Sequence, residues 1–234
     1  MNNKIIYDCY IGPPVYGVLT AEDTLRRRAI FVEELKNLVG FRTYIPELEH
    51  EGLIFYEIGY FLELIYRGSP EAFTMLNMGD DFIEKSTHEI RILKDNKDKF
   101  ISKAVPEFLY TYAKKSAEDL FKENSYFSDE KSVKKLEYDK NIAYICSLYL
   151  RIAKDVLLHS EFKVEREDAQ ILSAVKEGYF SKETIEKEIE VQLEEVEKLL
   201  KETRLPPNPS KDLLNQLLFK IRGVENIEEK IRIE

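Results

Sequence analysis

Short runs of β-branched and aromatic residues near the N-terminus predict strands. Residues 4–11 form the first run, and Gly12-Pro13-Pro14 directly after it predicts its end. Residues 28–32 and 53–56 have the same character. The segment from 33 to 46 is ambiguous, because periodicity does not separate a strand from a helix in short apolar runs.

From Glu57 onward the apolar positions recur at three- and four-residue intervals, which predicts helices. Gly68 predicts the end of the first helix, and Pro70 predicts the first residue of the next. Ser181 is the expected N-cap of a late, acid-rich helix. The other helices are predicted over residues 70–77, 100–121, 138–158, 166–177 and 211–221. The pattern therefore predicts a small α/β module over residues 1–95, followed by an all-helical module over residues 96–234.

Composition narrows the classes of protein that need to be considered. The chain has 234 residues and a formal net charge of −9, which disfavours capture of duplex DNA by a basic surface. Cys9 and Cys146 cannot form a disulfide framework, and the three histidines lie too far apart for a zinc site. No signal peptide or membrane-spanning segment is expected. We therefore expect a protein of the cytoplasm that does not contact a membrane.

Four segments, in order, carry a resemblance to a known family. The sequence is similar to the nucleotidyltransferase-like branch of the DNA polymerase β superfamily that is found in bacteria and phages. The order and spacing of the segments, over almost the whole chain, support the resemblance more than any one of them does. The segments are 12–20 with 28–31, then 56–64 with 68–73, then 100–104 with 112–114, and finally 164–168 with Leu172, Lys176, Gly178 and Tyr179.

The resemblance implies a fold and a chemistry. The implied fold is α+β, with an N-terminal mixed sheet, flanking helices and a C-terminal helical module packed across the cleft. The implied reaction is nucleotidyl transfer assisted by two Mg²⁺ ions. Magnesium requires hard oxygen ligands, so the family uses an Asp-x-Asp pair on one strand and a third carboxylate from a neighbouring strand. A glycine-serine turn holds the triphosphate.

The residues at the matching positions depart from that pattern. Pro13 stands at the serine of the turn and supplies neither an N–H nor a hydroxyl. Thr24 and Arg26 fall on the two aspartates, and an arginine would repel a metal ion. The third carboxylate falls near Gly52, next to Glu51. We therefore predict no catalytic residues and no metal ligands at these four degenerate positions.

Other family positions have changed as well. Gly59 and Tyr60 replace a basic pair, and Tyr144 and Ser147 replace a histidine and an arginine, whereas Lys140 is kept. The correlated changes are typical of a scaffold that is kept after catalysis is lost.

A shifted register offers an alternative metal site. Glu22 and Asp23 are adjacent and would point to opposite faces of a strand, so they make a poor pair. Asp23 together with Glu49 or Glu51 is the remaining arrangement.

Three consecutive arginines, Arg26, Arg27 and Arg28, stand where the metal would bind. Arginine binds phosphate without a metal, so one interpretation is an anion or nucleotide site. That site would be formed by Gly12, Arg26, Arg28, Lys140 and Arg166. The other interpretation is that Arg28 is structural and its two neighbours pair with acids such as Glu22 or Glu33. Both interpretations stay open at this point, as do base stacking, protein docking and plain core packing for Tyr7, Tyr10 and Tyr16.

Three functions follow as hypotheses. The first is a catalytically degenerate protein that binds a protein partner, for example a phage-encoded inhibitor of a host defence or toxin component in the host cytoplasm. The second is an active nucleotidyl- or adenylyltransferase whose Mg²⁺ site is rearranged. The third is a metal-free nucleotide or oligonucleotide sensor. No resident cofactor is expected apart from a nucleotide ligand, and the sequence does not indicate an oligomeric state.

Overall fold

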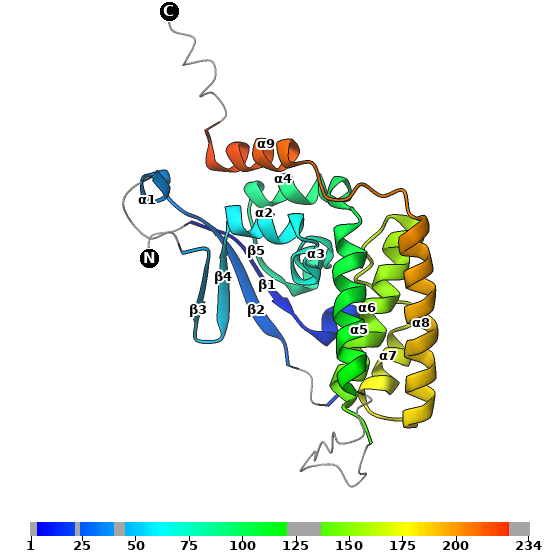
Figure 1. Ribbon diagram of the computed structural model, residues 1–234. Coiled ribbons are helices and arrows are strands. Elements are labelled where there is room, and N and C mark those ends of the chain that lie inside the picture. The colour runs from blue at the N-terminus through cyan, green and yellow to red at the C-terminus, as the bar shows by residue number, and fades with distance from the viewer. Residues whose placement is uncertain (1–3, 22–23, 40–44, 121–136, 225–234) are drawn as a thin grey trace, which may run out of the picture.

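A mixed sheet of five strands forms the N-terminal part of the protein, seen here in a computed structural model (Figure 1). The structure describes residues 4–21, 24–39, 45–120 and 137–224. The strand order is β3-β4-β2-β1-β5; β2 and β4 run parallel, and the other neighbours are antiparallel. The strands are β1 (Lys4–Ile11), β2 (Arg26–Val32), β3 (Glu47–His50), β4 (Leu53–Glu57) and β5 (Ile83–Ser86).

The three strands predicted from composition are present. The structure begins β2 at Arg26, before the predicted residue 28, so the arginine triplet lies inside the strand. β3 and β5 were not predicted, because both are mostly exposed and rich in charge. Glu51 and Gly52 connect β3 to β4 with positive φ angles of 52° and 77°. The position of the third family carboxylate is therefore a tight hairpin turn.

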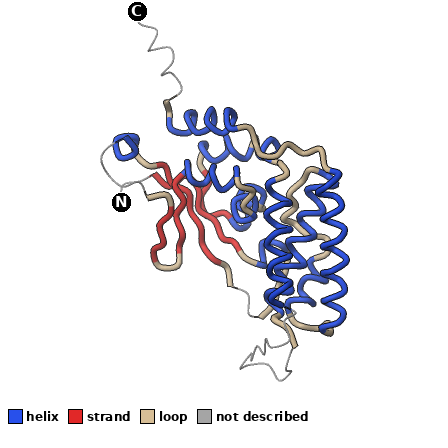
Figure 2. Tube along the Cα trace, viewed as in Figure 1, coloured by secondary structure: helices blue, strands red, loops and turns tan. Residues whose placement is uncertain are grey.

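Helices cover one face of this sheet, as Figures 1 and 2 show. The covering helices are α2 (Ile58–Tyr66), α3 (Pro70–Asn77) and α4 (His88–Lys94). The short helix α1 (Leu35–Val39) lies in the ambiguous segment. The described residues up to Phe100 also contain three single-turn 3₁₀ helices: η1 (Pro13–Tyr16), η2 (Asp80–Phe82) and η3 (Lys97–Phe100).

Gly68 brings the first helix of the second module against the sheet module. Its φ is 75°, and an added Cβ would lie 2.4 Å from the carbonyl oxygen of Ala104. Only glycine combines this backbone angle with such a close approach. Gly68, which the sequence predicted to end a helix, therefore also allows the beginning of α5 to lie next to α3.

The second part of the chain is helical. Helices α5, α6 and α8 pack along one another, and α7 packs on α6 (Figure 1). The last helix returns to contact α2 and α4, so it lies over the sheet module and apart from the other late helices. These helices are α5 (Ala104–Leu120), α6 (Lys140–His159), α7 (Ala169–Lys176), α8 (Lys182–Glu202) and α9 (Lys211–Arg222).

The observed architecture confirms the α+β fold class. One continuous apolar core includes residues of both parts, from Ile6 in β1 to Ile221 in α9. The boundary between residues 95 and 96 stays a prediction. That division placed α9 in the helical module, whereas α9 contacts α2 and α4 of the sheet module. None of the described helices combines the length and the apolar character that crossing a bilayer requires.

Candidate functional site

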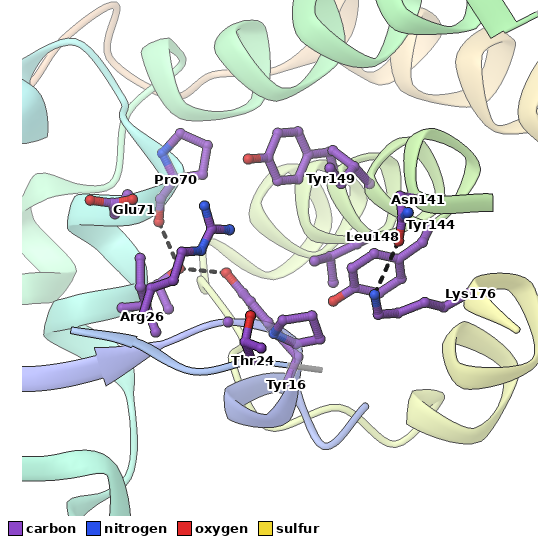
Figure 3. Close-up of a pocket in the computed structure, with 15 residues that line it drawn as sticks. Tyr16, Thr24, Arg26, Pro70, Glu71, Asn141, Tyr144, Leu148, Tyr149 and Lys176 are labelled. Carbon is purple, nitrogen blue, oxygen red and sulfur yellow. Dashed lines mark hydrogen bonds between the residues drawn. The ribbon is translucent and has the colours of Figure 1, made fainter. Parts of the chain in front are cut away.

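A cavity of about 480 Å³ lies where the turn after β1 faces helices α3 and α6 (Figure 3). We call it the Gly12 cavity. Its walls come from the turn, the beginning of β2 and α3 on one side and from α6 and α7 on the other. The lining residues are Ile11, Gly12, Pro13, Tyr16, Thr24, Arg26, Pro70, Glu71, Thr74, Asn141, Tyr144, Ile145, Leu148, Tyr149 and Lys176.

The turn itself requires glycine but supplies few donors. Gly12 has a φ of 141°, and an added Cβ would lie 2.9 Å from the carbonyl oxygen of Thr24. Pro13 and Pro14 have no N–H. The N–H of Val15 donates to the carbonyl of Gly12 at 3.1 Å. Three successive backbone positions that could hold a phosphate are therefore without an available N–H.

Tyr16 anchors the turn to helix α3. Its hydroxyl forms a hydrogen bond with Oγ1 of Thr74, and this oxygen also donates to the carbonyl of Pro70 at 2.7 Å. Burial raises the pKa of Tyr16 to about 12, so the phenol stays neutral at physiological pH. Tyr16 therefore acts as a structural clamp whose ring forms part of the cavity wall.

Arg26 is the exposed cation of the Gly12 cavity. It is the first residue of β2, and its guanidinium points toward the space between Pro70 and Tyr149 (Figure 3). Its charge acts on Tyr149 and favours the ionised phenol, although burial dominates and raises the pKa of that residue. Over the ranges that the structure describes, no side chain forms a hydrogen bond or an ion pair with Arg26.

The other two arginines of the triplet are bound to acids. The Arg28 side chain is buried, and its Nε donates to Oε1 of Glu71 at 2.8 Å. The Tyr56 hydroxyl also donates to Glu71. Arg27 pairs with both carboxylate oxygens of Asp8, at 2.8 and 2.6 Å. The structural interpretation therefore applies to Arg27 and Arg28, with partners other than those expected, and the anion-binding interpretation remains for Arg26.

Helices α6 and α7 form the far wall. Asn141, Tyr144 and Tyr149 face the cavity from α6 (Figure 3). Lys176, at the end of α7, donates from Nζ to Oδ1 of Asn141 at 3.2 Å and lies 5.4 Å from the centre of the Tyr144 ring. This wall presents the Tyr149 ring to an occupant, whereas the Tyr144 ring is buried and has Lys176 over it.

The carboxylate content of the cavity determines whether Mg²⁺ fits. Of the lining residues that the structure describes, one is an acid, Glu71, which Arg28 and Tyr56 already hold. Among the described residues, no group of three or more histidine, cysteine, aspartate or glutamate side chains could hold a metal ion. Glu22 and Asp23, the shifted-register alternative, lie outside the described residues. The described residues around the Gly12 cavity do not fit a two-magnesium site.

The positions that the resemblance assigns to the metal ligands do not all line the cavity. Thr24 and Arg26 line the cavity. The parallel register pairs Arg28 with Ile54. Arg26 and Gly52 each lie two residues before this pair, so they lie on the same side of it. Gly52 lies in the exposed hairpin turn and does not line the cavity.

Two other predicted binding residues lie outside the cavity lining. Arg166 is held by Asp155 and Asp168, each at 2.7 Å, and Lys140 is the first residue of α6. Lys176, Asn141, Tyr149 and Glu71 line the cavity instead, and the sequence interpretation did not assign them to the site. The three- and four-residue spacing of Asn141, Tyr144, Ile145 and Leu148 was the signal that could have found this wall.

The sheet, the glycine turn and the cavity beside it accompany a match to a family with a nucleotidyltransferase-like fold. Residues 1–146, more than half of the chain, match the model of the RlaP family, the RNA repair pathway DNA polymerase beta family. The chain belongs to this family. No curated protein and no solved structure is detectably similar to it. Tyr149 and Lys176 lie beyond the matched residues, so part of the cavity wall lies outside the region that defines the family.

Proposed function

We propose that this chain is a catalytically degenerate nucleotidyltransferase-fold protein that acts by binding, and that a nucleotide occupies the Gly12 cavity without a metal ion. The observation that carries the proposal is the side chain of Arg26. It stands at the second aspartate position and points into the cavity. A guanidinium binds phosphate oxygens through two parallel hydrogen bonds and requires no metal for it.

The charges of the lining favour an anion. Arg26 contributes a positive charge, and the negative charge of Glu71 is offset by Arg28. The cavity volume of about 480 Å³ is within the usual range for small-molecule sites. The ring of Tyr149 offers a surface on which a base can stack. A ligand with a phosphate at Arg26 and a base against Tyr149 would be a nucleotide.

Loss of catalysis is supported by the turn and the strand together. Pro13 and Pro14 remove donors from the phosphate turn, and Thr24 and Arg26 remove the carboxylate pair. A metal-dependent transfer would need both features to be restored from elsewhere. Glu71 is a poor substitute, because ion pairing with Arg28 occupies it.

The protein-partner hypothesis, including a phage-encoded inhibitor of a host defence or toxin component, remains a second proposal. The net charge of −9 would suit a partner with a basic face. The described part of the chain offers a defined cavity for a nucleotide but no comparably defined surface for a protein. For this reason we rank nucleotide binding first.

The test is isothermal titration with ATP and GTP, first in EDTA and then with Mg²⁺. We expect binding in EDTA that Mg²⁺ does not strengthen. Arg26→Ala should abolish the heat, whereas Arg67→Ala, which removes an exposed arginine paired with Glu63 on α2, should leave it unchanged. Heat that appears only with Mg²⁺ would contradict the proposal, and so would absence of binding under both conditions.

A further inference from the structure

Asn141 and Lys176 form a pair across the Gly12 cavity from Arg26 (Figure 3). Asn141 is the second residue of α6, and Lys176 is the last residue of α7. The Nζ of Lys176 donates to Oδ1 of Asn141 at 3.2 Å. The same ammonium group lies 5.4 Å from the centre of the Tyr144 ring, a cation–π contact that favours this position. The packing of α7 on α6 therefore gives the Asn141 side chain a defined partner.

The partner determines which way the Asn141 amide points. An ammonium group can only donate, so the amide atom that faces Lys176 is the oxygen. The Nδ2 keeps two N–H donors, and in the part of the chain that the structure describes no acceptor is bound to them. A second donor at Oδ1 would bring a partly positive hydrogen next to the charge of Lys176. The amide therefore offers donors and no available acceptor to an occupant of the cavity.

The carboxylate in the lining lies on the other side of the cavity. Glu71 belongs to α3, opposite Asn141 in Figure 3, and it accepts hydrogen bonds from Arg28 and Tyr56. An amino group of a ligand that is placed next to Asn141 therefore faces the Nδ2 donors of that residue. A carbonyl oxygen in the same place accepts a hydrogen bond from them.

We propose that the Gly12 cavity selects nucleotides by the exocyclic group of the base, and that it prefers the carbonyl of hypoxanthine, guanine or uracil to the amino group of adenine or cytosine. The proposal rests on the proposed function, with the phosphate at Arg26, and adds the recognition of the base edge by Asn141. An asparagine that recognises adenine uses both its oxygen and its nitrogen, and here Lys176 occupies the oxygen. Lys176 is a positioning residue, because it acts on the base through the orientation of the Asn141 amide.

The experiment compares two matched pairs of nucleotides in EDTA by isothermal titration. ITP and ATP differ by a carbonyl in place of an amino group on the purine, with the accompanying proton on the neighbouring ring nitrogen, and UTP and CTP differ in the same way on the pyrimidine. We expect ITP to bind at least about tenfold more tightly than ATP, a factor that corresponds to about 1.4 kcal/mol, and UTP more tightly than CTP. Equal affinities within each pair, or tighter binding of ATP and CTP, would overturn the inference.

Variants of the pair test the mechanism through the ratio of the ITP and ATP affinities. Asn141→Asp replaces the two donors by an acceptor and should reverse the preference. Lys176→Met frees Oδ1 to accept from adenine and should reduce the preference to less than about threefold. Asn215→Asp makes the same chemical change at an exposed position of α9 and should leave the ratio unchanged.

The outcomes separate the recognition of the base from nucleotide binding itself. A preference for ITP that survives Asn141→Asp would overturn the assignment of Asn141. Binding of all four nucleotides with equal affinity would overturn the inference and leave the proposed function intact. Absence of binding by all four would overturn the proposed function, and the inference with it.

Discussion

Arg222, at the end of the last helix, donates a hydrogen bond from Nη2 to Oε1 of Glu57, 2.7 Å away and 165 residues earlier in the chain. Glu57 is fully buried and is the N-cap of α2, where its Oε2 accepts the N–H of Gly59 at 2.6 Å. The pair connects α9 to the end of β4, where the residue before Glu57, Tyr56, holds Glu71 in the cavity wall. The C-terminal helix is thus tied to the module that carries the site.

Removal of this arginine should destabilise the protein. Arg222→Ala takes a positive charge away from a fully buried carboxylate, and breaking such a buried pair costs about 3–5 kcal/mol of the free energy of unfolding. Urea denaturation measures the change. Lys220→Ala, at an exposed position of the same helix, is the matched control and should change the free energy of unfolding by less than about 0.5 kcal/mol. Equal effects of the two variants would contradict a stabilising role for the pair.

A second ion network should make stability depend on pH. Burial acts to raise the pKa of Asp168, but hydrogen bonds and charge from Arg166 and Arg151 outweigh it and hold the pKa below its usual value of 3.8. A lowered folded-state pKa contributes stability above the unfolded pKa, and this contribution is lost as pH falls through the folded value. The free energy of unfolding should therefore fall more steeply below pH 4 in the unmodified protein than in Asp168→Asn.

The control for the pH series is Asp212→Asn, at an exposed position of α9. Its urea-unfolding profile between pH 6 and pH 3 should run parallel to that of the unmodified protein. If Asp168→Asn also runs parallel, Asp168 is not the group that links folding to protonation. A loss of stability that begins above pH 6 would point to a different group.

The two cysteines should be chemically silent in the folded protein. Burial raises the pKa of both the Cys9 and the Cys146 thiol to about 12, and neither side chain is accessible. The thiolate is the reactive form, so a disulfide reagent at pH 8 should react very slowly with the native protein. Denaturation in urea should release both thiols at once. Rapid reaction of one thiol before unfolding would show that its helix or strand opens locally.

The sequence predicted elements well where burial or special residues specify them. The strand from Lys4 to Ile11 and the helix from Pro70 to Asn77 have the predicted bounds, since one is buried on the sheet and the other has proline at its first position. β3 and β5 escaped prediction, because exposed strands held by pairing with a neighbour carry little hydrophobic pattern. Local patterns report burial, and these strands are not buried.

The residues of the Gly12 cavity also differ in how well the sequence could predict them. Gly12, Thr24 and Arg26 could be assigned from the turn and its spacing, because they are close in sequence as well as in space. Tyr149 and Lys176 come from α6 and α7, and only the packing of those helices across the turn brings them to Gly12. Arg166 was assigned to the site from its charge. Its two aspartate partners, which determine its role, become apparent only once α6 and α7 are placed together.

The last prediction concerns the metal site that the sequence resemblance implies. Thr24→Asp combined with Arg26→Asp restores an Asp-x-Asp pair at the entry to β2, on positions that both line the Gly12 cavity. Both positions face the same cavity, so the two carboxylates can share a divalent cation. Titration with Mn²⁺, followed by its electron paramagnetic resonance signal, should show a bound ion in this variant and none in the unmodified protein. Nucleotide binding should change from metal-independent to metal-dependent, because the Arg26 guanidinium has been replaced by a carboxylate.

Leu25→Asp combined with Arg67→Asp makes the same change in net charge without forming the pair, and it should not bind Mn²⁺. The restored pair should still not transfer a nucleotidyl group, since Pro13 and Pro14 leave the phosphate turn without its N–H donors. Adding Pro13→Ser then tests the turn separately. If the restored pair binds Mn²⁺ but ATP turnover appears only after Pro13→Ser is added, then both the carboxylate pair and the turn are needed for catalysis. Absence of Mn²⁺ binding by the restored pair would mean that Thr24 and Arg26 do not occupy the aspartate positions, and the assignment of degeneracy at these residues would fail.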